Sequence, residues 1–281
     1  MFKNTLKTFT LLAALGGLFI FFGGLIGGQT GVVIGLAIGL VFVGGSYWFS
    51  DKLAVKSAGA QEVSEASAPK LYATVRELAE RADMPMPRVY LSPNAQPNAF
   101  ATGRNEQRAV VCVTQGLLQV LDEQEVRGVL AHEISHIRHR DILIGSVAAA
   151  VAMAITALAT FARFAMIFGG GRDDDDGANP LVLLAFAIFA PIAALLIQMS
   201  ISRSREYEAD RGGAELCGSG APLASALNKI EHYAKQVPMN VSPAQATAYI
   251  VNPLTGRRVQ FASWFQTHPP TEERIRRLLA A

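Results

Sequence analysis

Two histidines and a glutamate within Ala131–His136 have a spacing suited to a metal-dependent hydrolytic site. His132 and His136 are one helical turn apart, so on a helix both imidazoles lie on one face and can bind a single ion. Glu133 follows the first histidine, where its carboxylate can take a proton from a water molecule at that ion. The pattern H-E-x-x-H arises by chance in roughly one chain in a few hundred. A metal site therefore also requires a third ligand in a sensible place.

A helix is predicted around this motif. Asp122 and Glu125 have the spacing of a capping box at its start. Apolar residues then recur at helical intervals: Val126, Leu130, Ile134 and Ile137. The two histidines are therefore expected on a regular helix.

The composition indicates an integral membrane protein. Of the 281 residues, 51% are hydrophobic and only 17% are charged, and the apolar residues are concentrated in blocks. A net charge of +2 argues against a nucleic-acid-binding protein that works through bulk charge. Cys112 and Cys217 lack metal-site or framework spacing, so they are expected to be reduced core residues, in keeping with a cytosolic active domain.

Residues 1–50 are predicted to form an N-terminal transmembrane hairpin. Apolar runs at about 9–27 and 31–49 are each close to the ~20 residues that cross a bilayer. A short uncharged connection, Gly28–Gly31, joins them and suits a helical hairpin better than a cleaved signal peptide. Glycines in both runs would let the two helices approach closely.

A second transmembrane hairpin is predicted over residues 142–201. Its apolar runs, 142–168 and about 180–201, are separated by a loop containing Asp173–Asp176. This acidic loop lacks the alternation of an EF-hand, so solvent exposure is favoured over calcium binding. Basic residues flank both hairpins on the other side: Lys3, Lys7, Lys52, Lys56, Arg138, Arg140, Arg203 and Arg205. Both termini and the large polar segments are therefore expected in the cytoplasm.

Residues 51–141 are predicted to be the first cytoplasmic catalytic segment. A polar linker over 51–67 leads into a helix at about 68–82, followed by strands at Arg88–Leu91 and Ala109–Val113. Between the strands, small residues over 97–103 suit an exposed sheet edge, which could bind a substrate backbone by strand addition. An ordinary hairpin explains the same residues equally well.

The third ligand is expected in residues 202–281, the second cytoplasmic catalytic segment. A tight hairpin must return the chain to the side it left, which brings Glu206 level with the two histidines, each ~8–9 Å beyond its apolar run. Glu206 and Asp210 share a helix face, so we predict Glu206 on the metal and Asp210 behind one histidine. Two histidines and one glutamate leave a coordination position open, as in catalytic zinc sites. Solvation of both carboxylates, or pairing with nearby arginines, is the alternative.

Several motifs in this order resemble the HtpX-type membrane zinc endopeptidases, gluzincin relatives of the CAAX-prenyl proteases. They are Asn98–Gly103, His132–His136, Arg140-Asp141, Ser202–Asp210 and His268-Pro269. The resemblance covers nearly the whole chain and implies one Zn²⁺ bound by His132, His136 and Glu206.

The resemblance also implies roles for other residues. Glu133 would be the general base, with Asp210 supporting a zinc ligand. His268 would lie over the active site, and Arg274 would help to bind substrate or the developing oxyanion. From the sequence alone, His268-Pro269-Pro270 indicates a turn before a final helix, and Arg274 belongs to that helix's basic face. Substrate-binding candidates on the predicted edge are Asn98, Ala99 and Phe100.

The resulting prediction is a mainly α integral membrane protein. About four transmembrane helices would carry a zincin-like α+β cytoplasmic catalytic domain with a small sheet, in the plasma (bacterial inner) membrane. The resemblance implies an endopeptidase acting on misfolded or damaged membrane proteins in quality control or stress response. Two alternatives stay open: an intramembrane metalloprotease, and a non-catalytic scaffold that keeps zinc for stability.

Overall fold

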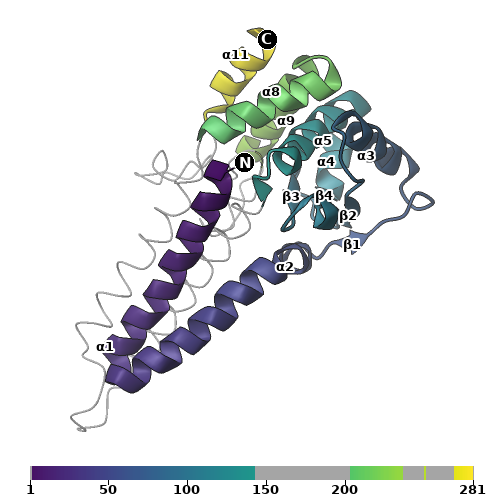
Figure 1. The fold of residues 1–281 in the computed structure, drawn as a ribbon. Helices are drawn as coiled ribbons and strands as arrows, with labels where there is room; N and C mark the ends of the chain where they lie inside the picture. Colours follow the sequence, from purple (N-terminus) through teal and green to yellow (C-terminus); the bar gives the residue numbers. More distant parts are fainter. Residues whose placement is uncertain (1, 143–202, 237–249, 251–268, 281) are drawn as a thin grey trace.

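The computed structural model describes residues 2–142, 203–236, 250 and 269–280 (Figure 1). Apart from Ile142, the predicted hairpin over 142–201 lies outside the described residues, and so does His268.

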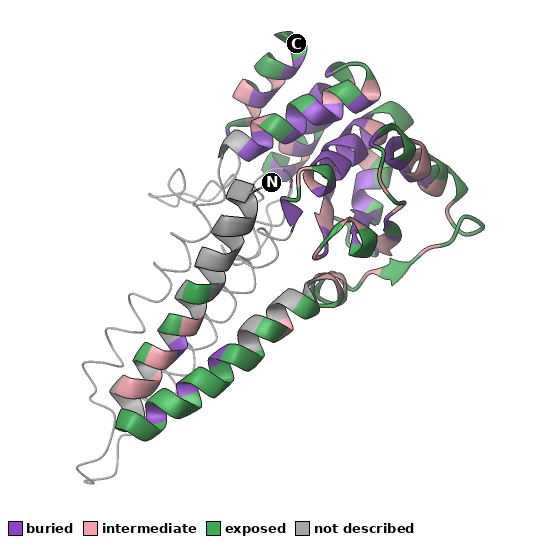
Figure 2. Cartoon of the chain, viewed as in Figure 1, coloured by how far each residue is buried: buried purple, intermediate pink, exposed green. Residues whose placement is uncertain are grey.

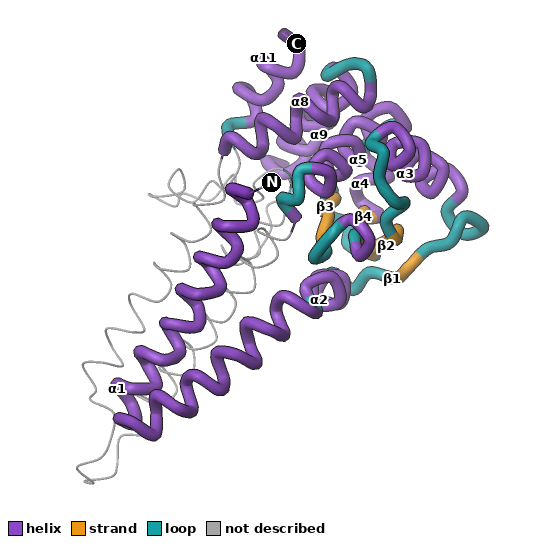
Figure 3. Tube along the Cα trace, viewed as in Figure 1, coloured by secondary structure: helices purple, strands orange, loops and turns teal. Residues whose placement is uncertain are grey.

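The polar domain, which follows the first apolar segment, contains a small mixed sheet (Figure 3). Its strands run in the order β1-β2-β4-β3; β2 and β4 are parallel, and the other two pairs are antiparallel. The strands are β1 (Gln61–Glu62), β2 (Arg88–Ser92), β3 (Ala99–Thr102) and β4 (Val110–Thr114). The two predicted strands and the small sheet are confirmed, and β3 lies at an edge, as expected for residues 97–103.

The central strand β4 is buried along its whole length because its residues are almost all apolar. Cys112 lies in this strand, and burial raises the pKa of its thiol to about 12. Cys112 and Cys217 are both free, as predicted. Cys112 therefore acts as a small apolar core residue.

Helix α3 (Pro69–Arg81) lies between β1 and β2, and α4 (Gln115–Val120) and α5 (Glu123–Arg138) follow β4. The predicted apolar side of α3 is buried in the same core as the sheet. The capping box of Asp122 and Glu125 is present at the start of α5. Figure 2 shows α5 as the most continuously buried helix, so the H-E-x-x-H motif lies on the central helix of the domain.

In the C-terminal half, α8 (Arg203–Cys217) and α9 (Ala221–Gln236) cover α5, and α11 (Thr271–Ala280) packs against α9 and α8. Glycines set the distance between these helices. A Cβ on Gly213 of α8 would lie 2.9 Å from the backbone nitrogen of His132, and one on Gly128 of α5 would lie 2.6 Å from that of Leu223. Only glycine permits this approach without displacing backbone.

The first apolar segment, α1 (Phe2–Trp48), doubles back on itself (Figure 1). Gly28 has a φ of +56°, the left-handed region that glycine tolerates, at the predicted connection. A Cβ on Gly23 would lie 2.1 Å from the carbonyl oxygen of Gly31, so the two arms touch through glycine. Within the described residues, no helix has both the length and the continuous apolar character needed to cross a bilayer.

The prediction of a linker over residues 51–67 is wrong in detail. This stretch contains most of α2 (Ser50–Ser57) as well as strand β1. Tertiary contacts order it: Arg88 Nη2 donates to Asp51 Oδ2 at 2.9 Å, and Ser92 Oγ donates to the carbonyl oxygen of Ala58 at 2.6 Å. Composition does not reveal such contacts, because they depend on residues more than 30 positions away.

We expect Gly128→Ala to lower the thermal unfolding midpoint of the purified chain. Overpacking costs about 1–3 kcal/mol, which outweighs the roughly 1 kcal/mol that alanine gains over glycine in a helix. Gly45→Ala is the matched control, because a Cβ there meets nothing within 4 Å. A Gly128→Ala midpoint equal to that of the control would contradict the proposed close packing of α5 and α9.

Candidate metal centre

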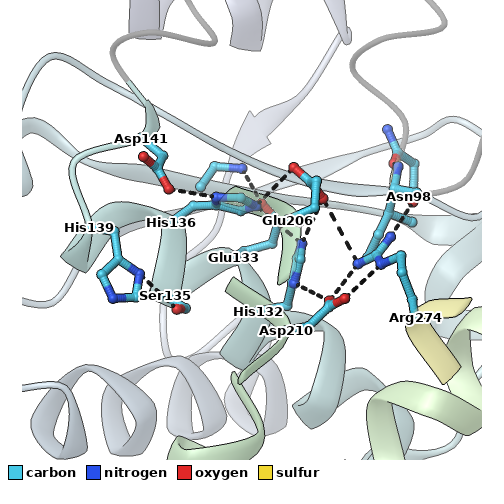
Figure 4. Close-up of polar contacts among 12 residues, drawn as sticks. Asn98, His132, Glu133, Ser135, His136, His139, Asp141, Glu206, Asp210 and Arg274 are labelled. Carbon is cyan, nitrogen blue, oxygen red and sulfur yellow. Dashed lines mark hydrogen bonds and ion pairs between the residues drawn. The ribbon is translucent and has the colours of Figure 1, made fainter. Parts of the chain in front are cut away.

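The structure brings His132, His136 and Glu206 together (Figure 4). Helix α5 supplies both imidazoles, and the first turn of α8 supplies the carboxylate. The two Nε2 atoms lie 3.1 Å apart. Glu206 Oε2 lies 3.7 Å from the Nε2 of His132, and Oε1 lies 3.6 Å from that of His136.

This geometry fits a metal ion. Atoms that bind one tetrahedral zinc ion at about 2.1 Å lie roughly 3.4 Å from each other, and the three distances fall on both sides of this value. The donor set of two imidazoles and one carboxylate matches catalytic zinc sites, which leave one position open. The described residues therefore could hold zinc without rearrangement of the backbone.

Each histidine has a carboxylate behind its Nδ1 atom. Asp210 Oδ1 lies 3.0 Å from Nδ1 of His132, and Asp141 Oδ2 lies 3.4 Å from Nδ1 of His136. A proton held on Nδ1 by a carboxylate leaves the lone pair of Nε2 available for a metal.

Asp141 reaches His136 through the turn that ends α5. Arg140 has a φ of +58°. The Asp141 N–H donates to the carbonyl oxygen of His136, and the Arg140 N–H donates to that of Ile137, both at 2.9 Å. These two bonds form a Schellman motif, which carries Asp141 back beside the histidine. Sequence reasoning gave Asp141 no role; its place directly after Arg140, within one of the motifs of the resemblance, was the available signal.

Arg274 supports the opposite side of the centre. Its side chain is 1% exposed. Nε and Nη2 donate to the two carboxylate oxygens of Asp210 at 2.9 and 2.7 Å, and Nη1 donates to the carbonyl oxygen of Ile250 at 3.1 Å. All three guanidinium nitrogens therefore bond to protein groups, and the predicted contact of Arg274 with substrate or the developing oxyanion stays a prediction.

The charges shift the pKa values of these groups. Burial raises the pKa of Asp210, but the charge of Arg274 and bonds from Arg274 and His132 outweigh burial and hold this pKa well below its usual range. Burial lowers the pKa of His136, but the charge of Glu206 and the bond to Asp141 outweigh it and raise this pKa to about 9. The buried carboxylates therefore stabilise positive charge at the atoms that could bind a metal ion.

Glu133 lies between this cluster and the edge strand. Its side chain is buried, and its Oε2 accepts a hydrogen bond from the Ala101 N–H at 2.9 Å. Thr114 N–H donates to the carbonyl oxygen of Asn98, so the peptide groups of Asn98 face β4. By the alternation of an antiparallel pair, the peptide groups of Ala99 and Ala101 face away from β4, toward the centre.

The predicted substrate-binding residues lie along this edge. Phe100 is partly exposed and pairs with Cys112 of β4, whereas Ala99 is buried. The Asn98 side chain is also buried, and its Oδ1 accepts from the Ile250 N–H at 3.1 Å.

A buried H-E-x-x-H helix, a glutamate from a following helix and an adjacent sheet edge define a metallopeptidase. The model of peptidase family M48 matches residues 65–281, and the chain belongs to this family. The chain is 54% identical over 279 residues to proteins named Protease HtpX homolog from Burkholderia mallei and Burkholderia pseudomallei, covering 98% of this chain and 96% of theirs. Family, relatives and site together define a membrane-associated metalloprotease.

A solved structure shares the fold. The crystal structure of S. mikatae Ste24p matches with a TM-score of 0.52 at 17% sequence identity, covering 99% of this chain and 65% of that chain. This chain therefore has the M48 fold, which combines helices with a small mixed sheet.

We expect Asp141→Asn to weaken zinc affinity about 10–100-fold, because an amide orients and polarises His136 less well than a carboxylate. The measurement is zinc competition against a chromophoric chelator. Glu208→Gln is the matched control, since Glu208 lies on the exposed side of α8. Equal affinities for the two variants would show that Asp141 does not support His136.

Zinc affinity should also rise with pH up to about 9. Below this value, His136 of the metal-free protein carries a proton that zinc must displace, because its pKa is raised to about 9. The expected slope is at most about tenfold per pH unit, measured by competition between pH 6.5 and 8.5 after correction for chelator protonation. A flat profile would contradict a protonated His136 in the metal-free site.

Proposed function

We propose that the chain is an integral membrane zinc endopeptidase that holds one zinc ion on His132, His136 and Glu206. The observation that carries the proposal is the mutual approach of these three ligand atoms, all within 4.8 Å of one another. Membership of family M48 supports zinc as the metal and polypeptides as substrates.

When bound, zinc would act as a Lewis acid that polarises the substrate carbonyl and lowers the pKa of a water molecule. Glu133 is the general base. Its carboxylate takes a proton from the attacking water and then donates it to the nitrogen of the leaving amine. The bond from the Ala101 N–H holds this carboxylate beside the sheet edge, where the scissile peptide would lie.

A substrate strand would pair with the outward peptide groups of Ala99 and with the carbonyl oxygen of Ala101, because the Ala101 N–H is bonded to Glu133. An edge strand offers main-chain hydrogen bonds that do not depend on substrate sequence. Phe100 would contact substrate side chains from its partly exposed position. This arrangement suits a peptidase that cuts varied polypeptides.

Asp210 and Arg274 position the zinc ligand His132. The two-point bond between Arg274 and Asp210 fixes the carboxylate that faces His132. Asn98 positions Ile250 through its side chain. For His268, the family resemblance supports a contact with the developing oxyanion.

The apolar runs at 9–27, 31–49 and within 142–201 support anchoring in the bacterial inner membrane by about four helices. Basic flanks support a cytoplasmic catalytic domain and cytoplasmic termini. A site close to the bilayer would suit misfolded or damaged membrane proteins as substrates. The family resemblance supports a role in quality control, and the relatives named Protease HtpX homolog support the protease activity.

The site geometry favours this function over the two alternatives. An intramembrane protease requires its ligands within apolar helices, whereas His132 and Glu133 lie in a helix beginning Glu123-Gln124-Glu125. A scaffold with structural zinc has no use for a carboxylate at position 133, yet Glu133 is held beside the ligands by the edge strand.

We expect Glu133→Gln to reduce proteolysis at least about 100-fold, because glutamine cannot accept the proton of water. Zinc content should stay at one ion per chain, since the three ligands are unchanged. The assay uses purified protein and a membrane-protein substrate, with chelation and zinc add-back.

Glu123→Gln is the matched control, since Glu123 lies on the same helix with an exposed side chain. This variant should retain wild-type proteolysis. Wild-type activity in Glu133→Gln would rule out the mechanism, and activity that survives full zinc removal would rule out the metal.

A further inference from the structure

We propose that the outward face of residues 48–56 binds the headgroups of anionic phospholipids and holds the edge strand at a fixed position relative to the bilayer surface. This face, here called the headgroup face, consists of Trp48, Phe49, Lys52, Leu53 and Lys56. The inference rests on the proposed membrane location of the chain.

The side chains of the headgroup face are either large and apolar or basic. At 100° per residue, Lys52, Leu53 and Lys56 of α2 fall within roughly 100° of arc, and Trp48 and Phe49 directly precede this helix. Trp48, Phe49 and Leu53 are 58%, 47% and 47% exposed, although all three are large and apolar. Tryptophan beside lysine is the combination enriched where a bilayer meets water.

The lysines of this face differ from three described lysines elsewhere in the chain. Lys70, Lys229 and Lys235 each pair with a carboxylate. Lys52 and Lys56 are exposed and form no ion pair with any residue in the described part of the chain. Lys52 Nζ instead lies 5.6 Å from the ring centre of Phe49. Two cations without a protein counter-charge, next to exposed aromatic rings, complement anionic headgroups.

The opposite face of α2 is fixed to the sheet. Asp51 is bonded to Arg88 of β2, and Ala58 at the end of the helix accepts from Ser92. Helix α2 therefore cannot turn its apolar residues inward without breaking these bonds. Figure 2 shows exposed residues continuing from the second arm of α1 into this region, so the face lies where the apolar hairpin meets the polar domain.

Arg104 connects the headgroup face to the edge strand β3. The guanidinium carbon of Arg104 lies 4.6 Å from the ring centre of Trp48, and its Nη1 donates to the carbonyl oxygen of Trp48 at 3.3 Å. Arg104 follows Gly103, which ends β3 with a φ of +131°. Insertion of Trp48 into the headgroup layer would thus also fix the position of β3, the edge proposed to bind substrate, relative to the bilayer.

The test measures lipid binding without proteolysis. The full chain carries Glu133→Gln and Trp264→Phe, so that Trp48 is its only tryptophan and catalysis is not needed. Detergent-solubilised protein is titrated with phosphatidylglycerol, with phosphatidylcholine, or with inorganic phosphate, while Trp48 emission is followed. We expect a saturable change with phosphatidylglycerol alone.

Lys52→Gln/Lys56→Gln should weaken this response about 25-fold, because each basic side chain near an anionic surface contributes about fivefold. Lys70→Gln/Lys235→Gln, which removes two exposed lysines elsewhere, should leave it unchanged. Equal responses to both lipids, saturation by inorganic phosphate, or a Lys52→Gln/Lys56→Gln response like that of the control would overturn the proposal. A positive result alongside an inactive wild-type enzyme would instead refute the proposed protease function alone.

Discussion

An excess of buried negative charge is the constraint on which this structure depends. Six charged side chains around the metal centre are at most 7% exposed: Glu133, Asp141, Arg205, Glu206, Asp210 and Arg274. Four are carboxylates and two are guanidinium groups, so these six side chains carry a net charge of −2, which a proton on His136 reduces to −1 in the metal-free protein. Burying an unbalanced charge costs several kcal/mol, and a divalent cation would remove the imbalance. The same excess raises the pKa of His136 to about 9, against the effect of burial.

This charge cluster requires three helices that are far apart in the sequence to meet. Helix α5 brings the imidazoles, α8 brings Glu206 and Asp210, and α11 brings Arg274. Gly212 and Gly213 let α8 lie against α5: a Cβ on Gly212 would lie 2.3 Å from Ser135 Oγ, and one on Gly213 would lie 2.9 Å from the nitrogen of His132. Small residues in α8 are therefore as necessary to the centre as its ligands, because a wider gap would separate Glu206 from the histidines.

The parts predicted from sequence depend on local spacing or on simple topology. The capping box predicts the helix around His132, the apolar run predicts β4, and the expectation of a returning hairpin predicts the nearness of Glu206. The role of Asp141 was not predicted, because its position depends on a left-handed backbone conformation at Arg140. Arginine does not indicate such a conformation in a sequence. The pairing of Arg274 with Asp210 and the formation of α2 were not predicted either, because both depend on tertiary contacts between distant segments.

Ile250 connects β3, the edge proposed to bind substrate, to the metal centre. Its N–H donates to the side chain of Asn98, directly before β3, and its carbonyl oxygen accepts from Arg274, which holds Asp210 behind His132. Both polar groups of one residue are therefore bound by buried side chains, which fixes its backbone. A displacement of Ile250 would move the proposed substrate strand and loosen the support of a zinc ligand together. The position of β3 and the orientation of His132 thus cannot vary independently in this fold.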